Sequence, residues 1–406
     1  MTILRAFRFY NFRLHIAGQF VSLIGTWMQR VAISWLIYRL TNSAVLLGFV
    51  SFLSLIPSLF LSPYAGSFTD RHNKFTLVKF TQIALMLQAG AMTLLVWFKW
   101  YSIPMICILS LIQGIISAFD NTGRQAMMSE IVPEKDDLPN AIALYSSAFN
   151  VARLLGPALA GFTLSTIGED ACFFINFLSF IMVLICLFAM KLSKAPFPKR
   201  EANVWNELKD GYYYLKSAPD ISSLILLLTC SSMMLIPFTT LLPVLASDIF
   251  HGNAVTFSWF ESAGGVGALF GALYMANIKP GKPLTGVVLV ATTILSAALI
   301  LLAFASHINY AIFFTLLAAL GMMIQTSAIN TYVQTHSVPE MRGRAVSYYL
   351  MSYQGILPIG SLLVGIMADK WGMAVTLATE GFLGLIIIGV FYWYNKYKLT
   401  PKSLQL

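Results

Sequence analysis

The chain has 406 residues, of which 58% are hydrophobic and only 11% are charged, and its formal net charge is +9. Soluble globular proteins typically hold about 45–50% apolar and about 25% charged residues, so this chain has too little charge to cover a water-facing surface. Four cysteines are too few for a secreted disulfide scaffold, and 30 Phe, 17 Tyr and 8 Trp exclude a disordered chain. The composition predicts a helical protein that crosses a membrane many times.

Runs of about 20 mostly apolar residues, the length that a membrane helix needs, recur along the whole chain. We predict twelve spans joined by short loops. The first run follows several arginines, as a signal peptide would, but it is too long for one and lacks a small-residue cleavage site, so we expect the protein to retain it. The predicted spans are residues 12–38, 44–68, 75–98, 103–128, 140–167, 171–191, 221–247, 256–277, 284–305, 309–333, 343–367 and 373–395.

The basic residues favour one side of the membrane. When the N-terminus is placed inside, most of the 26 Lys and Arg residues fall on inner loops, and only Arg39, Lys99 and Lys370 fall on outer loops. Positive charge collects on the cytoplasmic side of membrane proteins, so we expect both termini in the cytoplasm. The net charge then reflects topology, and we expect no nucleic-acid partner.

The longest polar stretch divides the predicted spans into six and six. We expect an N-terminal six-helix bundle over residues 1–191, a cytoplasmic linker over 192–220, and a C-terminal six-helix bundle over 221–406. Residues 204–215 of the linker have the pattern of an amphipathic helix that lies at the inner membrane surface. The predicted fold class is an all-α membrane protein with twelve transmembrane helices in two bundles.

The two halves of the chain repeat each other in the same orientation. Repeated halves of six spans are typical of a two-bundle transporter with its site between the bundles. The tripeptide Val-Pro-Glu at 132–134 recurs at 338–340, and Gly156 and Gly161 match Gly360 and Gly365, each 204 residues later.

The segment 66–74, GSFTDRHNK, resembles the loop between the second and third spans of the major facilitator superfamily, Gly-x-x-x-Asp-Arg followed by basic residues. Segments 11–13, 123–126, 139–144 and 152–161 resemble the subfamily of the enterobactin exporter and macrolide efflux pumps. The resemblance covers nearly the full chain and is densest in the first half. It implies the major facilitator fold, alternating access, export usually driven by proton entry, and a place in the bacterial inner (cytoplasmic) membrane.

The resemblance also implies a cytoplasmic gate at the end of the second span. Gly66 would let two helices approach closely in lipid. Asp70 would pair with a basic residue and a helix N-terminus, with Arg71 and Lys74 in the same loop, and would hold the inner side closed. The alternative for Asp70 is a solvated loop carboxylate.

Gly156-Pro157 lies in the middle of the fifth predicted span. Proline removes a backbone hydrogen bond and kinks a helix, and the resemblance implies a helix bend of the kind found in exporters. Proline is also commonly tolerated in membrane helices, so a plain helix is the alternative.

Charged residues inside the spans are the candidates for the mechanism, because each needs a partner or a wet cavity in the bilayer. Asp120 and Glu261 are our proton-coupling candidates. Asp120 shares a helix face with Arg124, four residues later, so a local ion pair without a transport role is its alternative. Glu261 could be only a carboxylate at the rim of the membrane, and Glu380 carries the least weight.

Arg30 is the leading substrate-binding candidate, because the first, fourth, seventh and tenth spans line the central cavity in the family that this chain resembles. Trp27 and Gln29 would add a stacking surface and an amide. Arg30 could instead extend to the outer surface, and Arg153 could contact an anionic substrate or stabilise the bundle. The uncharged candidates, which could equally form hydrogen bonds between helices, are Gln325 and Asn330.

The sequence has no P-loop, His-Glu-x-x-His or Cys-x-x-Cys motif, so we expect no direct ATP use, no metal, no cofactor and no enzymatic activity. We predict a secondary active exporter of a small amphiphilic molecule, either a siderophore or a drug-like compound, that takes protons in exchange and acts as a monomer in the bilayer. The arginines favour anionic or catecholate cargo, whereas the two candidate carboxylates favour cations. The alternatives are a lipid or lysolipid transporter of the same fold, and a non-transporting membrane sensor or channel.

Overall fold

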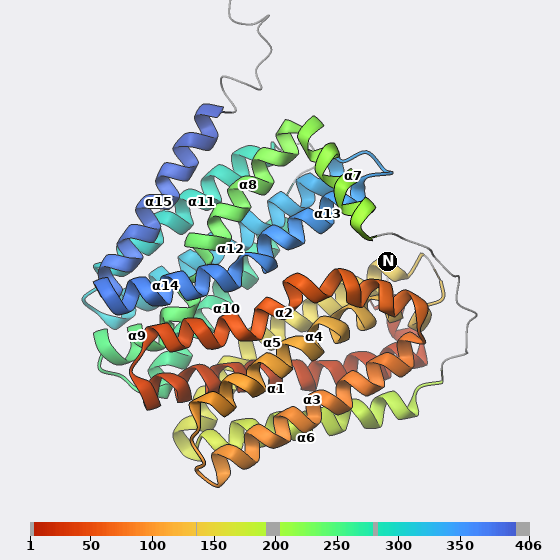
Figure 1. Cartoon of the computed structure of the whole chain (residues 1–406), viewed down its shortest axis with the longest axis horizontal. Coiled ribbons are helices and arrows are strands. Elements are labelled where there is room, and N and C mark those ends of the chain that lie inside the picture. The colour runs from red at the N-terminus through yellow and green to blue at the C-terminus, as the bar shows by residue number, and fades with distance from the viewer. Residues whose placement is uncertain (1–3, 135, 192–203, 279–282, 395–406) are drawn as a thin grey trace, which may run out of the picture. The chain divides into compact units, whose positions relative to one another are not determined.

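The computed structural model describes residues 4–134, 136–191, 204–278 and 283–394, and these residues are almost entirely helical (Figure 1). The elements in chain order are η1 (Arg5–Arg8), α1 (Tyr10–Thr41), α2 (Ala44–Arg71), α3 (Lys74–Trp97), α4 (Ile103–Ile131), α5 (Leu138–Thr166), α6 (Glu169–Ala189), α7 (Val204–Ser217), α8 (Pro219–Met234), η2 (Ile236–Leu241), α9 (Leu242–Val244), η3 (Leu245–Ile249), α10 (Ala254–Ala276), α11 (Leu284–Ala303), α12 (Ile308–His336), α13 (Arg342–Leu350), η4 (Met351–Gly355), α14 (Leu357–Trp371) and α15 (Met373–Tyr394).

The predicted helical ranges agree with these elements to within a few residues. Two predicted spans are interrupted. The seventh changes from α8 through η2 and α9 to η3, and the eleventh changes from α13 through η4 to α14. A proline lies at the start of η2 (Pro237), of α9 (Pro243) and of α14 (Pro358). Because proline has no N–H group, it cannot continue the hydrogen bonding of the preceding helix.

Ten helical segments within the described ranges are long and apolar enough to cross a membrane. They include all the predicted spans except α5 and α10. These two helices carry Arg153 and Glu261 among many small and polar residues, which lowers their hydropathy. The all-helical membrane fold is confirmed, whereas the full set of twelve spans in two bundles stays a prediction.

The chain separates into two compact units. The first unit holds Met1–Thr41, Leu53–Ala202 and Asn253–Ser262, and the second holds Asn42–Phe52, Asn203–Gly252 and Ala263–Leu406. The short segments Asn42–Phe52 and Asn253–Ser262 therefore do not follow the predicted boundaries. The assignment of residues 1–191 and 221–406 to separate bundles stays a prediction.

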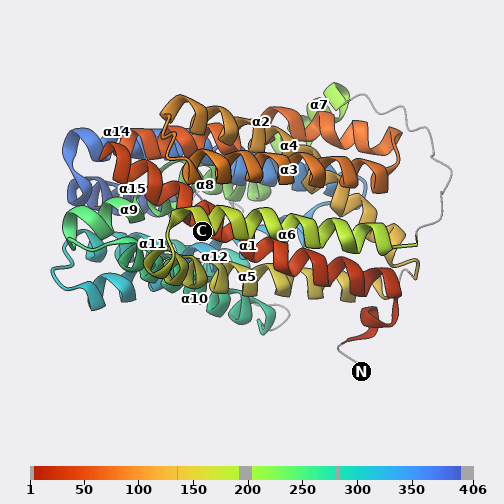
Figure 2. The same ribbon diagram turned by 90° about the horizontal axis from the view of Figure 1, so that it is seen from below.

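Close helix packing in the first unit centres on α1, which lies beside both α5 and α6, while α3 packs against α4 and α6 (Figure 2). Gly25 shows why the α1–α6 contact can be so close. A Cβ atom there would stand 2.7 Å from Ser179 Oγ and 2.8 Å from Asn176 Oδ1. Small residues of this kind let helix backbones approach in a membrane.

The repeated glycines make matching contacts in the two units. A Cβ on Gly156 of α5 would meet Trp27 of α1, and one on Gly360 of α14 would meet Met233 and Pro237 of the predicted seventh span. The other pair, Gly161 and Gly365, meets the first turns of α10 and α2, at Ser258 and Ala44 respectively. Matching glycines in the two halves therefore pack against matching helices: the first and seventh predicted spans in one case, the eighth and second in the other. The sequence repeat is thus also a repeat of helix contacts.

The amphipathic helix predicted in the linker is present as α7, while residues 192–203 of that linker lie outside the described residues. In the second unit α7 packs against α13. Asp210 pairs with Arg344 at 3.3 Å, and the Tyr214 hydroxyl accepts a hydrogen bond from the Val338 backbone N–H at 3.2 Å. A Cβ on Gly211 would stand 2.8 Å from the Tyr348 ring, so a larger residue there would separate the two helices.

Candidate functional site

Four of the predicted functional residues come together in the first unit. The Arg30 guanidinium carbon lies 5.1 Å from the centre of the Trp27 ring, and that of Arg153 lies 5.8 Å from the same ring. The Glu261 carboxylate is within electrostatic range of both guanidinium groups. We call Trp27, Arg30, Arg153 and Glu261 the arginine–tryptophan site.

Three helices contribute to this site. On each of them, two residues three positions apart, which lie on the same helix face, form the site or its packing contacts. Trp27 and Arg30 come from α1, Arg153 comes from α5, and Glu261 comes from α10. On α5 the partner three positions after Arg153 is Gly156, whose Cβ would stand 2.4 Å from the Trp27 Cβ. Any side chain at this glycine would push Trp27 away from Arg153.

The first turns of α10 are held against α1 and α5. A Cβ on Gly161 would lie 1.8 Å from Ser258 Oγ, so only glycine permits this approach. The rings of Phe257 and Trp35 stack at 6.3 Å with 19° between their planes. These contacts fix the position of Glu261, one turn after Ser258, beside the two arginines.

The site combines charged groups with apolar surface. Arg30 is exposed, while Trp27, Arg153 and Glu261 are half-buried. Phe149 of α5 packs edge-on against Trp27 at 6.1 Å. Two guanidinium groups against one carboxylate leave one net positive charge, so the arrangement can bind an anion through hydrogen bonds and an apolar body through stacking.

Asp120 lies in a different environment, at the centre of a buried polar network. Its side chain has no exposed surface. It accepts hydrogen bonds from Thr81 Oγ1 at 2.7 Å and Gln82 Nε2 at 2.8 Å, and it pairs with Arg124, which donates to Gln19 of α1. The carboxylate thus joins α3, α4 and α1, an arrangement that favours the ion-pair alternative over a role in proton coupling.

Gln29 lies on the face of α1 opposite Trp27 and is almost fully buried. It accepts a hydrogen bond from Asn176 Nδ2 at 2.7 Å and donates to Gln88 and Gln113 at 3.3 and 3.4 Å. These bonds tie α1 to α3, α4 and α6. The structure therefore places Gln29 between helices and away from the arginine–tryptophan site.

The two uncharged candidates lie in α12, in the second unit. Gln325 is fully buried and donates to Ser231 Oγ of α8 at 2.8 Å. This is a hydrogen bond between helices, the alternative role that we considered for Gln325. Asn330 is half-buried and accepts a hydrogen bond from Gln334 one turn later at 3.0 Å. Both residues belong to the second unit, whereas the arginine–tryptophan site belongs to the first.

The predicted gate is only partly visible. The side chain of Asp70 lies outside the described residues. Arg71 is exposed, and Lys74 pairs with Glu130 of α4 at 3.1 Å. A Cβ on Gly66 would meet nothing within 4 Å among the described residues, so the close helix approach that we expected there is absent from this part of the structure.

The Gly156-Pro157 pair lies inside α5, which continues as one helix from Leu138 to Thr166. Gly156 has a clear role in this helix, because it admits the α1 backbone beside Trp27. The bend proposed for Pro157 stays a prediction.

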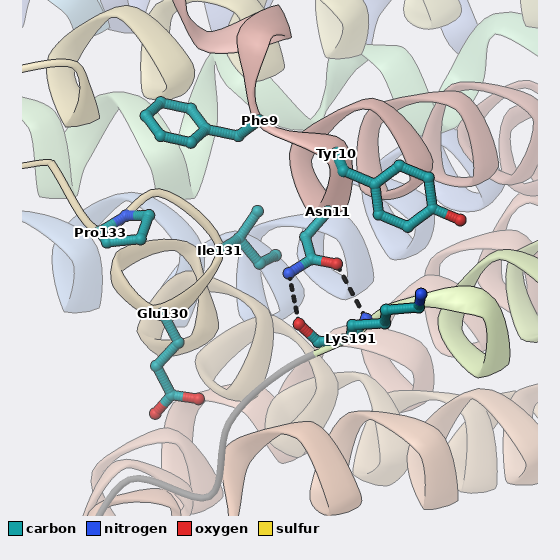
Figure 3. Close-up of a pocket in the computed structure, with 7 residues that line it drawn as sticks. All are labelled: Phe9, Tyr10, Asn11, Glu130, Ile131, Pro133 and Lys191. Carbon is teal, nitrogen blue, oxygen red and sulfur yellow. Dashed lines mark hydrogen bonds between the residues drawn. The ribbon is translucent and has the colours of Figure 1, made fainter.

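The hollow drawn in Figure 3 has a volume of about 580 Å³ and is formed where η1, α4 and α6 end. The Asn11 side chain donates to the Lys191 backbone oxygen at 2.8 Å and accepts from the Lys191 N–H at 2.9 Å (Figure 3). Nearby, the Ala6 N–H donates to Asn140 Oδ1 at 3.0 Å, and Arg8 pairs with Asp137 at 2.6 Å. These contacts hold residues 6–11 against the start of α5 and the end of α6.

The sequence did not predict these N-terminal contacts or the packing of Ser258 against Gly161. Asn11 and Asn140 stood in the segments that carried the family resemblance, which was the available signal, although it did not show that they fix the same N-terminal segment. For Ser258 the signal was Gly161 in the sequence repeat. Within the described ranges, no group of three His, Cys, Asp or Glu side chains could hold a metal ion.

Helices long and apolar enough to cross a membrane, with charged residues among them, are typical of membrane transport proteins. Residues 2–402 match the family described as transmembrane secretion effectors, and the chain belongs to that family of major facilitator transporters. The resemblance seen in the sequence segments is confirmed.

Relatives of known description cover nearly the whole chain. A staphyloferrin A transporter of Staphylococcus aureus (strain NCTC 8325 / PS 47) is 28% identical over 390 residues, which cover 94% of this chain and 95% of that protein. Macrolide efflux protein A of Streptococcus pyogenes is 23% identical and covers 88% of this chain and 89% of its own. This protein is accordingly an integral membrane transporter of small molecules and not an enzyme.

A solved structure shares the fold. The bacterial homologue of the human lysosomal transporter Spinster, in an inward-facing and unoccupied conformation, superposes with a TM-score of 0.74 at 13% identity. The superposition covers 95% of this chain and 97% of that one. At this identity the likeness shows the fold alone.

Proposed function

We propose that this transporter exports a small amphiphilic molecule with an anionic group, by alternating access and in exchange for protons. The observation that carries the proposal is the arginine–tryptophan site, in which two guanidinium groups approach one tryptophan ring beside a carboxylate. Guanidinium groups bind carboxylates and similar planar anions with paired hydrogen bonds. The neighbouring rings of Trp27 and Phe149 offer a surface for the apolar body of the cargo.

The cargo class follows from the balance of charge at this site. The two arginines outnumber Glu261, which favours an anionic cargo such as a siderophore over an organic cation. The relative named as a staphyloferrin A transporter supports a siderophore, and the macrolide efflux relative supports an amphiphilic drug-like compound. The side chain of Arg30 is exposed, so its guanidinium group is accessible to an anionic group of the cargo.

Glu261 is the proposed coupling residue. As a carboxylate it can accept a hydrogen bond from a hydroxyl or amino group of the cargo whose anionic group is bound by Arg30 and Arg153. A proton that binds Glu261 turns this charged acceptor into a neutral acid whose O–H group donates, so the proton competes with the hydroxyl or amino group of the cargo for the carboxylate. Competition of this kind lets proton entry drive cargo export, since the two are carried in opposite directions by alternating access.

We also propose the arrangement that this mechanism needs: two six-helix bundles over residues 1–191 and 221–406, twelve spans, and both termini in the cytoplasm of a bacterial cell. The gate residues Gly66, Asp70, Arg71 and Lys74 would close the inner side. The matching glycine contacts in the two units support the duplicated architecture.

Transport by proteoliposomes under an imposed pH gradient tests the proposal. We expect saturable movement of staphyloferrin A in wild type, and its loss in Arg153→Gln. Arg39→Gln is the matched control, because Arg39 lies on α1 but pairs with Glu169 at 2.8 Å, away from the site. Unitary currents without saturation would contradict the transport mechanism, and movement of lysolipid alone would contradict the proposed cargo.

A further inference from the structure

Glu380 of α15, in the second unit, is a carboxyl side chain with no exposed surface. Neither of its side-chain oxygens has a hydrogen-bond partner among the described residues. The helix that carries it is long and apolar enough to cross a membrane. An ionised carboxylate without a partner is strongly unfavourable in such surroundings, whereas the neutral acid is tolerated.

The helix face around Glu380 is pressed tightly against α11. A Cβ on Gly381 would stand 2.6 Å from the Ser296 backbone oxygen, and one on Gly384 would stand 2.1 Å from Ser296 Oγ. Ser296 Oγ is itself buried and has no hydrogen-bond partner among the described residues. One turn of α15 therefore faces an unused hydroxyl group and leaves no room for bulk water.

No charged residue lies in the described structure where it could neutralise Glu380. The helices packed against α15 are α11, α8 and α14. No residue of α11 is ionisable. The remaining titratable groups are Asp220 in the first turn of α8, Cys230 further along it, the exposed Asp369 and Lys370 in the last turn of α14, and Tyr392 and Tyr394 at the end of α15 itself.

We propose that Glu380 is a proton-binding site of the second unit. The carboxylate takes up one proton and forms a neutral carboxylic acid, which is the species that α15 and α11 can enclose. The proton returns to water when these helices separate, because only then can the carboxylate be solvated. The packing of the second unit carries this inference, which depends neither on the cargo nor on Glu261.

The site links the stability of the fold to pH. The unfolded chain releases a glutamate proton above about pH 4.3, whereas the folded chain retains it at Glu380. Since the folded state then binds the extra proton, raising the pH favours unfolding. The stabilising effect of this proton is therefore largest in acidic medium and declines as the medium becomes alkaline.

Infrared spectroscopy of the purified full-length protein tests the proposal directly. We expect the C=O stretching band of a protonated carboxylic acid at neutral pH in wild type, lost in Glu380→Gln and kept in Glu261→Gln. Glu380→Gln has the shape of the neutral acid and should also unfold at a temperature that depends less on pH than that of wild type. The absence of the band in wild type at neutral pH, or its full persistence in Glu380→Gln, would overturn the proposal.

A titration of wild type alone decides the matter if the glutamine variant does not fold. Persistence of the band into alkaline medium supports a proton held inside the fold. Disappearance of the band in the acidic range of an ordinary exposed glutamate would overturn the assignment.

Discussion

Replacing Asp120 with alanine tests whether the buried polar network holds the first unit together. The carboxylate accepts hydrogen bonds from Thr81 and Gln82 and pairs with Arg124, whose side chain is 14% exposed. Asp120→Ala removes all three interactions and leaves a nearly buried guanidinium group without its counter-charge. Breaking a buried ion pair by removing one partner costs about 3–5 kcal/mol, so we expect a loss of stability of that size.

Unfolding by heat or denaturant in detergent micelles measures this loss. Asp369→Ala is the matched control, because Asp369 is an exposed carboxylate at the end of α14 and its removal should have little effect. The double variant Asp120→Ala, Arg124→Leu removes both charges. We expect it to be more stable than the sum of the two single changes implies, by at least about 1 kcal/mol of coupling.

The opposite outcome has a clear meaning. An Asp120→Ala protein that unfolds at the wild-type temperature would refute the structural role of the ion pair. If the same variant also lost proton-driven export, Asp120 would be a coupling residue, as the other interpretation of the sequence holds.

Three further changes test the packing. Gly156→Ala should destabilise the protein by about 1–3 kcal/mol and weaken cargo binding, because its Cβ would stand 2.4 Å from the Trp27 Cβ of α1. The matched control is Gly389→Ala of α15, whose Cβ would meet nothing within 4 Å among the described residues, and it should leave both quantities unchanged. Asn11→Ala should lower stability by about 1–3 kcal/mol through the loss of two hydrogen bonds to the end of α6. Gln29→Leu should cost a similar amount while the dissociation constant of the cargo stays at the wild-type value, and a weaker affinity would return Gln29 to the binding site.

The sequence predicted the helices well because membrane helices depend on a local property. A run of apolar residues long enough to cross the bilayer forms a helix whatever its neighbours are, so α3 and α6 begin and end within two residues of their predicted bounds. Interruptions inside a span were harder to predict. Proline was visible, but the 3₁₀ and π turns of the seventh and eleventh spans depend on how neighbouring helices satisfy the freed backbone groups.

The candidate site was predictable in part. The spacing of Trp27 and Arg30 places both on one face of α1, and the charge of Arg153 and Glu261 marked them as residues with a partner. Which helices meet at that face depends on side-chain fit between distant segments, and it was decided here by Gly156 and by Gly161. The sequence repeat marked these glycines, but it did not show that they face α1 and α10.

For Gln29 and Glu380, burial likewise depends on contacts with distant helices that the sequence does not show. Gln29 is two residues from Trp27, yet the 3.6-residue period of the helix turns it to the opposite face, where partners from three helices bury it. Glu380 carried the least weight among the charges predicted inside the spans. Its complete burial depends on the close contact of Gly381 and Gly384 with α11, and the sequence does not show that these glycines face α11.

The central claim is that Arg30 and Arg153 select anionic cargo at the Trp27 ring. The most direct test compares the dissociation constants of purified wild type and of the double variant Arg30→Gln, Arg153→Gln. The ligands are three matched amphiphiles that share one apolar body and carry a carboxylate, a quaternary ammonium or no charge. Each lost charge-assisted hydrogen bond is worth about 1.5–3 kcal/mol, and about 1.4 kcal/mol is a tenfold change in affinity. We predict that wild type prefers the carboxylate and that the double variant binds it at least about 100-fold more weakly, with little change for the uncharged compound. Preference for the ammonium compound, or equal affinity of both proteins for the carboxylate, would contradict the account.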